Sequence, residues 1–120
     1  MAQVRILALM YRALMDAAIV CWEAKTFYCY PRPSQLDKDV HPRLPLPNFP
    51  SYPSGHSTFS GAAATVLSHF FPEDAKKLTL MAEEASMSRV YSALHFKMDC
   101  DAGMGIGKKV GNLAIESLGK

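Results

Sequence analysis

Apolar residues recur in steps of three and four along residues 2–27, and this spacing predicts one long amphipathic helix over about Ala2–Phe27. The segment is rich in Ala, Leu and Met and contains neither Gly nor Pro. Its charges argue against a membrane-spanning helix, which needs ~18 or more apolar residues with few or no charges. The apolar positions are Ile6, Leu9, Met10, Ala13, Leu14, Ala17, Ala18 and Cys21, and the charges within residues 2–24 are Arg5, Arg12, Asp16 and Glu23.

Residues 29–53 form a different kind of segment, in which proline recurs every few positions. Proline lacks a backbone donor and fixes φ, so a regular helix and a central strand are both excluded. We expect a stiff, extended loop that joins two helix ends. A connection of this length without its own structure is usually functional. The prolines are Pro31, Pro33, Pro42, Pro45, Pro47, Pro50 and Pro53.

The remaining residues predict three further helices. The first begins at Ser54 or Gly55, where Ser54 suits an N-cap, and ends near Phe70. The next runs from Pro72 to about Tyr91, and the last from near His95 or Met98 to about Leu118. The pattern contains no convincing strand, so the fold class is all-α, a bundle of about four helices with a long Pro-rich loop. Glycines in the last helix are expected at tight helix–helix contacts, and these are Gly103, Gly105, Gly107 and Gly111.

Composition narrows the function classes. The 120 residues are 49% apolar and 20% charged, which predicts a single domain over residues 1–120 with a buried core. The net charge of +2 is too small to indicate nucleic-acid binding. The cysteines Cys21, Cys29 and Cys100 form no Cys-x-x-Cys pair, so we expect buried free thiols and no structural zinc. No secretory signal is evident within these residues, and we expect a soluble protein, either cytoplasmic or exported.

Three short clusters carry the residue types that bind a tetrahedral oxyanion. Arginine offers two planar donors to two oxygens, and lysine offers a compact charge. The middle cluster coincides with a helix start, where free N–H groups attract an anion and glycine lets it approach the backbone. Taken alone, each of these Lys and Arg side chains would be interpreted as a solvated surface charge. The spacing of all three clusters together indicates a single site. The clusters are Lys25 with Arg32-Pro33, Pro53-Ser54-Gly55-His56, and Ser88-Arg89 with His95 and Asp99.

Two histidines are candidates for the chemistry. His56 follows the glycine directly, which places it beside the anion as a general acid or base. His95 and Asp99 are four residues apart, so they share one face of a helix. The carboxylate can fix the tautomer of the imidazole and leave the other nitrogen free as a nucleophile or metal-centre ligand. His41 and His69 fit no cluster and are expected to be structural or surface residues.

The pattern Lys-x6-Arg-Pro, Pro-Ser-Gly-His, Ser-Arg-x5-His-x3-Asp resembles the type 2 phosphatidic acid phosphatase and vanadium haloperoxidase superfamily, in particular its soluble bacterial haloperoxidase-like branch. The resemblance implies that His95 attacks phosphorus, or ligates vanadium if vanadate is bound. It implies that His56 protonates the leaving group and that Asp99 orients His95. It also implies an oxyanion site made of Lys25, Arg32, Ser54, Gly55 and Arg89, with Trp22 and Phe49 lining the pocket.

The resemblance leaves the activity open. The first reading is a metal-independent phosphomonoesterase with a phosphohistidine intermediate; the second is a vanadate-dependent haloperoxidase that uses peroxide and a halide. A third is a non-catalytic fragment that binds an oxyanion or only assembles. Superfamily domains usually have more helices, so the chain resembles the C-terminal, active-site half of the fold. A missing helix would leave an apolar face exposed, so we expect either a homodimer or a fragment of marginal stability. Ala93 stands where many members have glycine, which would matter for His95 if the position needs positive φ.

Overall fold

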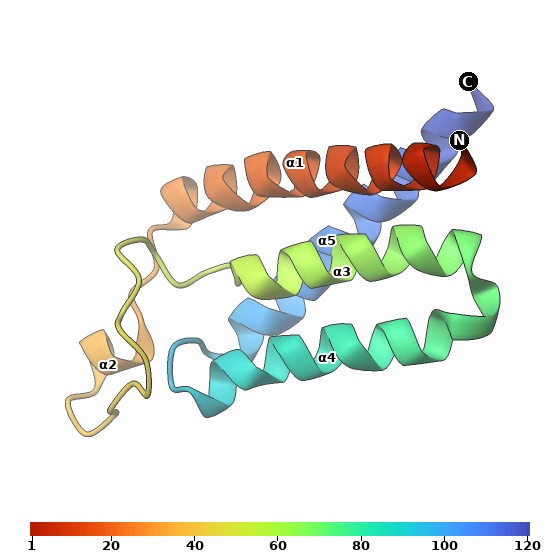
Figure 1. The fold of residues 1–120 in the computed structure, drawn as a ribbon. Helices are drawn as coiled ribbons and strands as arrows, with labels where there is room; N and C mark the ends of the chain where they lie inside the picture. The colour runs from red at the N-terminus through yellow and green to blue at the C-terminus, as the bar shows by residue number, and fades with distance from the viewer.

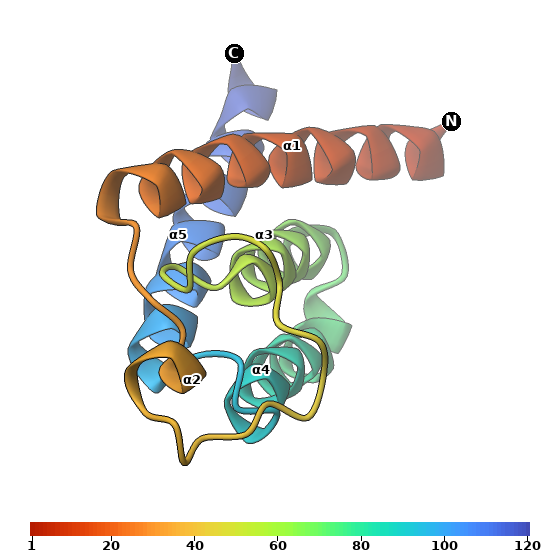
Figure 2. The same ribbon diagram turned by 90° about the vertical axis from the view of Figure 1, so that its left-hand side faces the viewer.

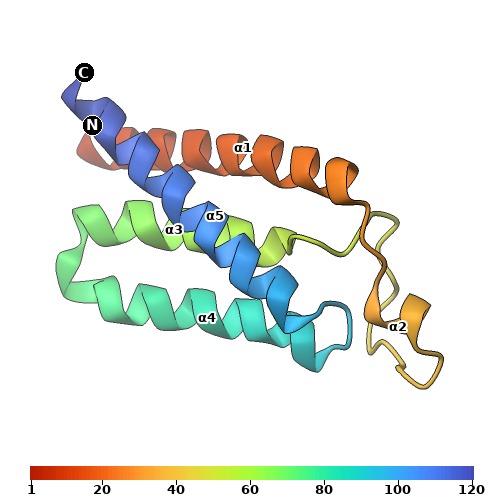
Figure 3. The ribbon, with the colours of Figure 1, turned by 180° about the vertical axis from the view of Figure 1, so that it is seen from behind.

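The structure is a computed structural model that describes residues 1–120, and it is all-helical as predicted (Figure 1). Helix α3 lies at the centre and contacts each of the other long helices. Helices α3 and α4 run antiparallel, α5 crosses behind them, and α1 lies across α3 and α5 (Figures 1, 2 and 3). The long helices are α1 (Ala2–Tyr28), α3 (Gly55–Phe70), α4 (Ala75–Tyr91) and α5 (Lys97–Glu116).

Most of the predicted helix boundaries are confirmed, and three short segments differ. Residues 33–36 were expected to be extended, but Pro33–Leu36 form the short helix α2. Proline is favoured at the first helical position, and the Gln35 side chain accepts a hydrogen bond from the Arg32 N–H (2.7 Å), which closes the turn. The segment Pro72–Asp74 is a 3₁₀ turn that precedes α4, and a second such turn, Ser117–Gly119, follows α5.

Small residues let α5 approach α3 closely. A side chain at Gly103 would lie 2.5 Å from the carbonyl oxygen of Ser54, and one at Gly107 would meet the carbonyl oxygen of Thr58. A side chain at Gly111 would lie 2.7 Å from Thr65 Cβ. The expectation of close contacts is therefore confirmed at these three positions. It is wrong at Gly105, where nothing lies within 4 Å of an added side chain.

The core is thin and formed largely from small residues. One cluster joins Leu9 and Ala13 of α1 to Val66 of α3 and Ala114 of α5. A second joins Ala17, Ala62 and Val110 of the same three helices. None of the helices is both long and apolar enough to cross a membrane. All three cysteines are free thiols, as predicted, but only Cys21 and Cys100 are buried. Cys29 is exposed; it follows α1 directly, in the left-handed conformation (φ 46°) that ends the helix.

Candidate active site

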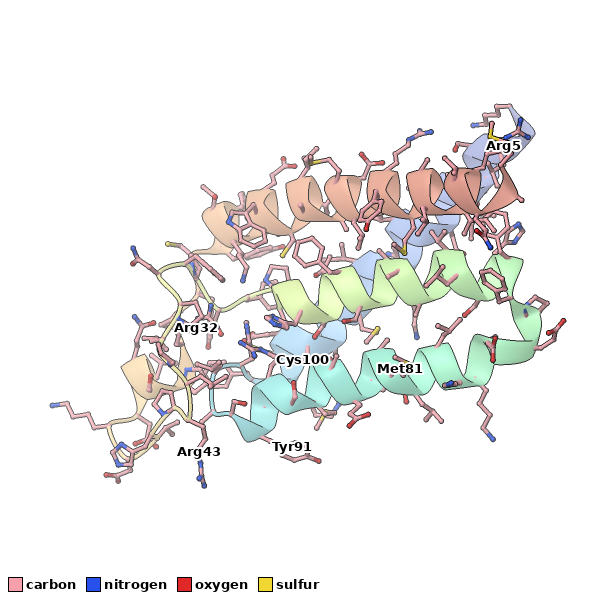
Figure 4. The ribbon with its side chains drawn as sticks, viewed as in Figure 1. Arg5, Arg32, Arg43, Met81, Tyr91 and Cys100 are labelled. Atoms are coloured by element: carbon pink, nitrogen blue, oxygen red, sulfur yellow. The ribbon has the colours of Figure 1, made fainter.

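A cavity of about 230 Å³ opens where α1 ends, α3 begins and α4 ends. The Pro-rich loop closes this end of the molecule and carries Arg32, which Figure 4 shows beside the start of α3. The predicted site residues therefore converge from segments far apart in the sequence. The cavity is lined by Trp22, Pro47, Phe49, Gly55, His56, Phe59, Ser60, Arg89 and His95.

His95 is held from both sides of its ring. Nδ1 lies 3.0 Å from Asp99 Oδ2, and Nε2 lies 2.9 Å from Arg32 Nη1. Because a guanidinium can only donate, Nε2 is the acceptor and the ring proton sits on Nδ1, facing the carboxylate. His95 is 4% exposed. Burial and the charge of Arg32 lower the pKa of His95 against the opposing effect of Asp99, so the neutral imidazole with a lone pair on Nε2 is favoured.

Asp99 is fully buried, and one of its oxygens receives three donors. Oδ2 accepts from Ser51 Oγ at 2.5 Å, from the Phe96 backbone N–H at 3.0 Å and from His95 Nδ1. Oδ1 is buried without a partner. Burial opposes ionisation, but hydrogen bonds from His95 and Ser51 outweigh it and hold the pKa of Asp99 below its ordinary value.

Ser51 is a site residue that the sequence analysis missed. It is fully buried in the Pro-rich loop, and besides Asp99 its hydroxyl lies 3.5 Å from His95 Nδ1. Its backbone N–H donates to the Tyr30 carbonyl at 2.9 Å. A lone serine two residues before the Pro-Ser-Gly-His motif gives no chemical signal, because its partner Asp99 is 48 positions away in sequence.

Arg32 ties the loop to the nucleophile candidate. It is 1% exposed, and Nη1 contacts both His95 Nε2 and the Leu94 carbonyl, the latter at 2.9 Å. Nε and Nη2 both donate to the Phe49 carbonyl, at 3.3 Å and 3.1 Å. The guanidinium thus contacts His95 Nε2 directly.

Lys25 lies beside the site without facing the cavity. Its ammonium donates to the carbonyl oxygens of Pro50 (2.7 Å), Ser51 (3.2 Å) and Pro53 (2.6 Å). Three acceptors use all three of its protons. Burial lowers the pKa of Lys25 to about 8. In this structure Lys25 therefore braces the loop from within, and its role toward an oxyanion stays a prediction.

The start of α3 presents a backbone and a histidine to the cavity. Ser54 caps the helix, since its hydroxyl accepts from the Ser57 N–H at 3.3 Å, and its side chain is buried away from the cavity. Gly55 and His56 both line the cavity. Burial lowers the pKa of His56, and the nearby charge of Arg89 lowers it further. An exposed His56 beside an arginine is placed to exchange protons with a bound anion.

Arg89 comes from the last turn of α4 and completes the lining. Its Nε is buried without a hydrogen-bond partner. An unpartnered guanidinium donor beside a cavity is a group that an anion would satisfy. The observation fits the predicted oxyanion site.

An aromatic wall borders the same cavity. Trp22 and Phe49 have ring centroids 5.3 Å apart, and Phe59 stands 6.3 Å from Trp22. Phe59 was not singled out in the sequence; its position one helical turn after His56 carries the only hint. The Phe49 ring also contacts both buried cations, with its centroid 5.1 Å from Lys25 Nζ and 5.3 Å from Arg32 Cζ.

The backbone is strained two residues before His95. Ala93 adopts φ 59°, the left-handed region that favours glycine. The sequence analysis raised this residue as a departure from the usual glycine, and the structure shows that the conformation is kept without it. His95 and Asp99 still meet at hydrogen-bond distance.

Fold and site together define an all-α domain with a candidate oxyanion pocket built around two histidines. The sequence matches the PAP2 superfamily over residues 4–119, and the chain belongs to this family. The predicted family resemblance is thereby confirmed.

Similar sequences include two non-specific acid phosphatases. That of Salmonella typhi is 44% identical over 57 residues, which are 48% of this chain and 23% of that protein. That of Providencia stuartii is 42% identical over 52 residues, which are 43% of this chain and 21% of that protein. The match spans less than a quarter of the length of either relative.

Three solved structures are similar to this chain. A bacterial vanadium-dependent iodoperoxidase has a TM-score of 0.83 at 28% identity, covering 92% of this chain and 32% of that chain. LpxE of Aquifex aeolicus has a TM-score of 0.86 at 31% identity, covering 93% and 68%. A transmembrane PAP2-type phosphatidylglycerolphosphate phosphatase of Bacillus subtilis shares the fold, with a TM-score of 0.73 at 23% identity.

Proposed function

We propose that this PAP2 protein hydrolyses phosphate monoesters through a phosphohistidine intermediate on His95. The observation that carries the proposal is the state of the His95 ring. Its Nδ1–H is held by a buried carboxylate, and its Nε2 lone pair lies at the cavity beside Arg32. An activated nucleophile needs this arrangement of nucleophile and orienting group.

The first step forms a bond between His95 Nε2 and phosphorus while the bond from phosphorus to the ester oxygen breaks. His56 gives its proton to the departing oxygen, so the alcohol leaves neutral. Asp99 stabilises the positive charge that develops on the His95 ring. The second step reverses these roles: neutral His56 takes a proton from water, the water oxygen attacks phosphorus, and Nε2 leaves. Inorganic phosphate is the product.

The anion is held by donors that converge on the cavity. Arg89 offers its unpartnered Nε, and the N-terminal end of α3 offers backbone N–H groups at Gly55 and His56. Arg32 Nη1 exchanges its contact with His95 Nε2 for a phosphoryl oxygen as Nε2 forms its bond to phosphorus. Ser54 and Lys25 support the site, the first as helix cap and the second through the loop carbonyls.

The second candidate is a vanadate-dependent haloperoxidase. Phosphate and vanadate are nearly isosteric, so His95 would be the ligand and the same donors would hold the oxygens; bound vanadate would supply peroxide activation. The aromatic wall of Trp22, Phe49 and Phe59 and the similarity to an iodoperoxidase structure favour this candidate. As a phosphatase the protein needs no cofactor. A non-catalytic oxyanion-binding fragment is the third candidate.

The substrate we propose is a small-molecule phosphate ester, or a halide and peroxide in the second candidate, and the volume of the cavity, about 230 Å³, supports a substrate of this size. We also propose that the protein acts as a homodimer, because α1 keeps a row of exposed apolar side chains.

The experiment that separates these candidates is hydrolysis of a chromogenic phosphate monoester by the wild type and by His95→Ala. We expect turnover that vanadate inhibits and that the substitution abolishes. Turnover that survives in His95→Ala would refute the assignment. Wild-type protein that lacks phosphatase activity but brominates an indicator with vanadate and peroxide would establish the second candidate. Protein that lacks both activities, and whose melting temperature vanadate still raises, would indicate the third.

The role of His56 is tested with leaving groups of different basicity. His56→Ala removes the proton donor, so the rate loss should be large for an alkyl phosphate and small for a nitrophenyl phosphate, whose leaving group needs no proton. Equal losses on both substrates would contradict the general-acid role.

A further inference from the structure

Three buried polar side chains meet behind the candidate active site, where α3, α4 and α5 come together. Ser57 of α3 is fully buried, Ser86 of α4 is 6% exposed, and Cys100 of α5 is 1% exposed. The hydroxyls of Ser57 and Ser86 lie 2.7 Å apart, and the Cys100 thiol donates to the Ser86 carbonyl at 3.4 Å. None of the three takes part in the proposed chemistry. We call Ser57, Ser86 and Cys100 the polar junction.

The polar junction joins two helices that carry site residues. On α3, Ser57 directly follows His56. On α4, Ser86 lies one helical turn before Arg89. Cys100 belongs to α5, which passes behind both helices (Figure 4). The junction therefore connects the helix of the proposed general acid to the helix of the arginine that lines the cavity.

The hydroxyls of the junction form a directed chain that ends at the cap of α3. Ser57 Oγ donates to Ser54 Oγ at 3.0 Å, so the proton between Ser57 and Ser86 comes from Ser86. Ser54 Oγ also accepts from the Ser57 N–H at 3.3 Å, which makes Ser54 the N-cap. The chain thus connects α4 to the helix start that presents Gly55 and His56 to the cavity.

The end of α4 is anchored at two points. Both hydrogen bonds that join α4 to α3 and α5 are made at Ser86. One turn later, the Arg89 carbonyl accepts from the His95 N–H at 3.3 Å. Two anchors one turn apart fix the rotation of the helix about its axis, and the direction of a helical side chain follows from that rotation. The side chain concerned is that of Arg89, whose Nε is buried without a partner.

We propose that the polar junction is a positioning element of the oxyanion site, which aims the Arg89 guanidinium at the anion bound by the start of α3. Ser57 and Ser86 act through Arg89, since neither serine lines the cavity. An anion needs donors at fixed separations, and a displacement of about 1 Å in one donor is enough to weaken its binding. The inference rests on the proposed oxyanion site, and it holds for a phosphate ester and for vanadate alike.

The test is orthovanadate binding to the full chain, measured by isothermal titration calorimetry, because binding needs no turnover. Ser86→Ala removes the donor to Ser57 and should weaken vanadate binding roughly tenfold. The matched control is Ser68→Ala, which removes a buried hydroxyl of α3 that has no hydrogen-bond partner and should leave the affinity unchanged. Far-UV circular dichroism checks that each variant is folded.

Two double variants test the route from the serines to the anion. Ser57→Ala/Ser86→Ala should bind vanadate no more weakly than Ser57→Ala alone, because both substitutions break the same chain. Arg89→Ala should bind vanadate more weakly than either single serine variant. Adding Ser86→Ala to Arg89→Ala should cause no further loss, because the side chain that the junction aims is then absent.

Three results would overturn the proposal. Wild-type affinity in both Ser57→Ala and Ser86→Ala would mean that the junction only stabilises the fold, and the proposed function would stand. Losses that add up in either double variant would mean that the serines do not act as one chain through Arg89. A wild type that binds no vanadate would remove the oxyanion site itself, and with it both the proposed function and this inference.

Discussion

Ser51→Ala tests whether this serine positions the His95–Asp99 pair. The substitution removes one of the three donors to Asp99 Oδ2 and leaves those from Phe96 and His95. A hydrogen bond to a charged group contributes about 1.5–3 kcal/mol, so the free energy of unfolding should fall by about 2 kcal/mol. Any buried hydroxyl could have such an effect on stability, so a second measurement is needed.

The second measurement is the pH dependence of kcat/KM. A carboxylate that loses a donor becomes more basic and holds the His95 Nδ1 proton more strongly, which raises the pKa of the His95 ring. The acid limb of the profile, where His95 loses activity by protonation, should therefore move to higher pH in Ser51→Ala. The mispositioned ring should also lower kcat by about tenfold, equivalent to ~1.4 kcal/mol in the barrier.

The matched control is Ser68→Ala, which removes a buried hydroxyl that has no hydrogen-bond partner. It should change neither the acid limb nor kcat. The reasoning is refuted if Ser51→Ala loses stability while its acid limb coincides with that of the wild type, since Ser51 would then be only a packing residue.

Three further predictions concern the fold and the two histidines. Gly107→Ala pushes a methyl group against the Thr58 carbonyl and should lower the free energy of unfolding, measured in urea, by about 1–3 kcal/mol. Gly105→Ala, with nothing within 4 Å of the added methyl group, should raise it by about 0.5–1 kcal/mol. Equal effects of the two substitutions would contradict the packing account. Ala93→Gly relieves the left-handed strain and should raise the free energy of unfolding by up to about 1 kcal/mol, and a loss would contradict the strain. The pKa values of His95 and His56 are both lowered from 6.5. Because activity needs a neutral His95 and a protonated His56, kcat/KM should peak below pH 6.5. An alkaline pH optimum would exclude these roles.

The helices could be predicted from the sequence because their signals are local. The three-and-four spacing marks α1, and Ser54 followed by Gly55 marks the start of α3. Helix α2 was missed because proline was read as a helix breaker, although Pro33 occupies the first helical position, where proline is favoured. Gly105 was misassigned because sequence spacing does not say which glycine of a helix faces its neighbour.

The residues of the site could be predicted from the sequence, but the hydrogen bonds that join them could not. Family spacing identified His56, His95 and Asp99, and the structure brings the last two to 3.0 Å. The partners of the cations could not be foreseen, because Lys25 binds backbone carbonyls that have no side-chain signature. Ser51 could not be identified from the sequence, because its contact with Asp99 joins two segments that meet only in the folded protein.

The measurement that tests the central claim most directly is capture of the covalent intermediate. The wild type is mixed with a nitrophenyl phosphate, quenched in alkali within the first turnovers, and mapped by peptide mass spectrometry. The account predicts one phosphoryl group on His95 that is stable to alkali and labile to acid, and that accumulates further in His56→Ala, where the second step lacks its base. Turnover without phosphorylated His95, or with the phosphoryl group on another residue, would contradict the account.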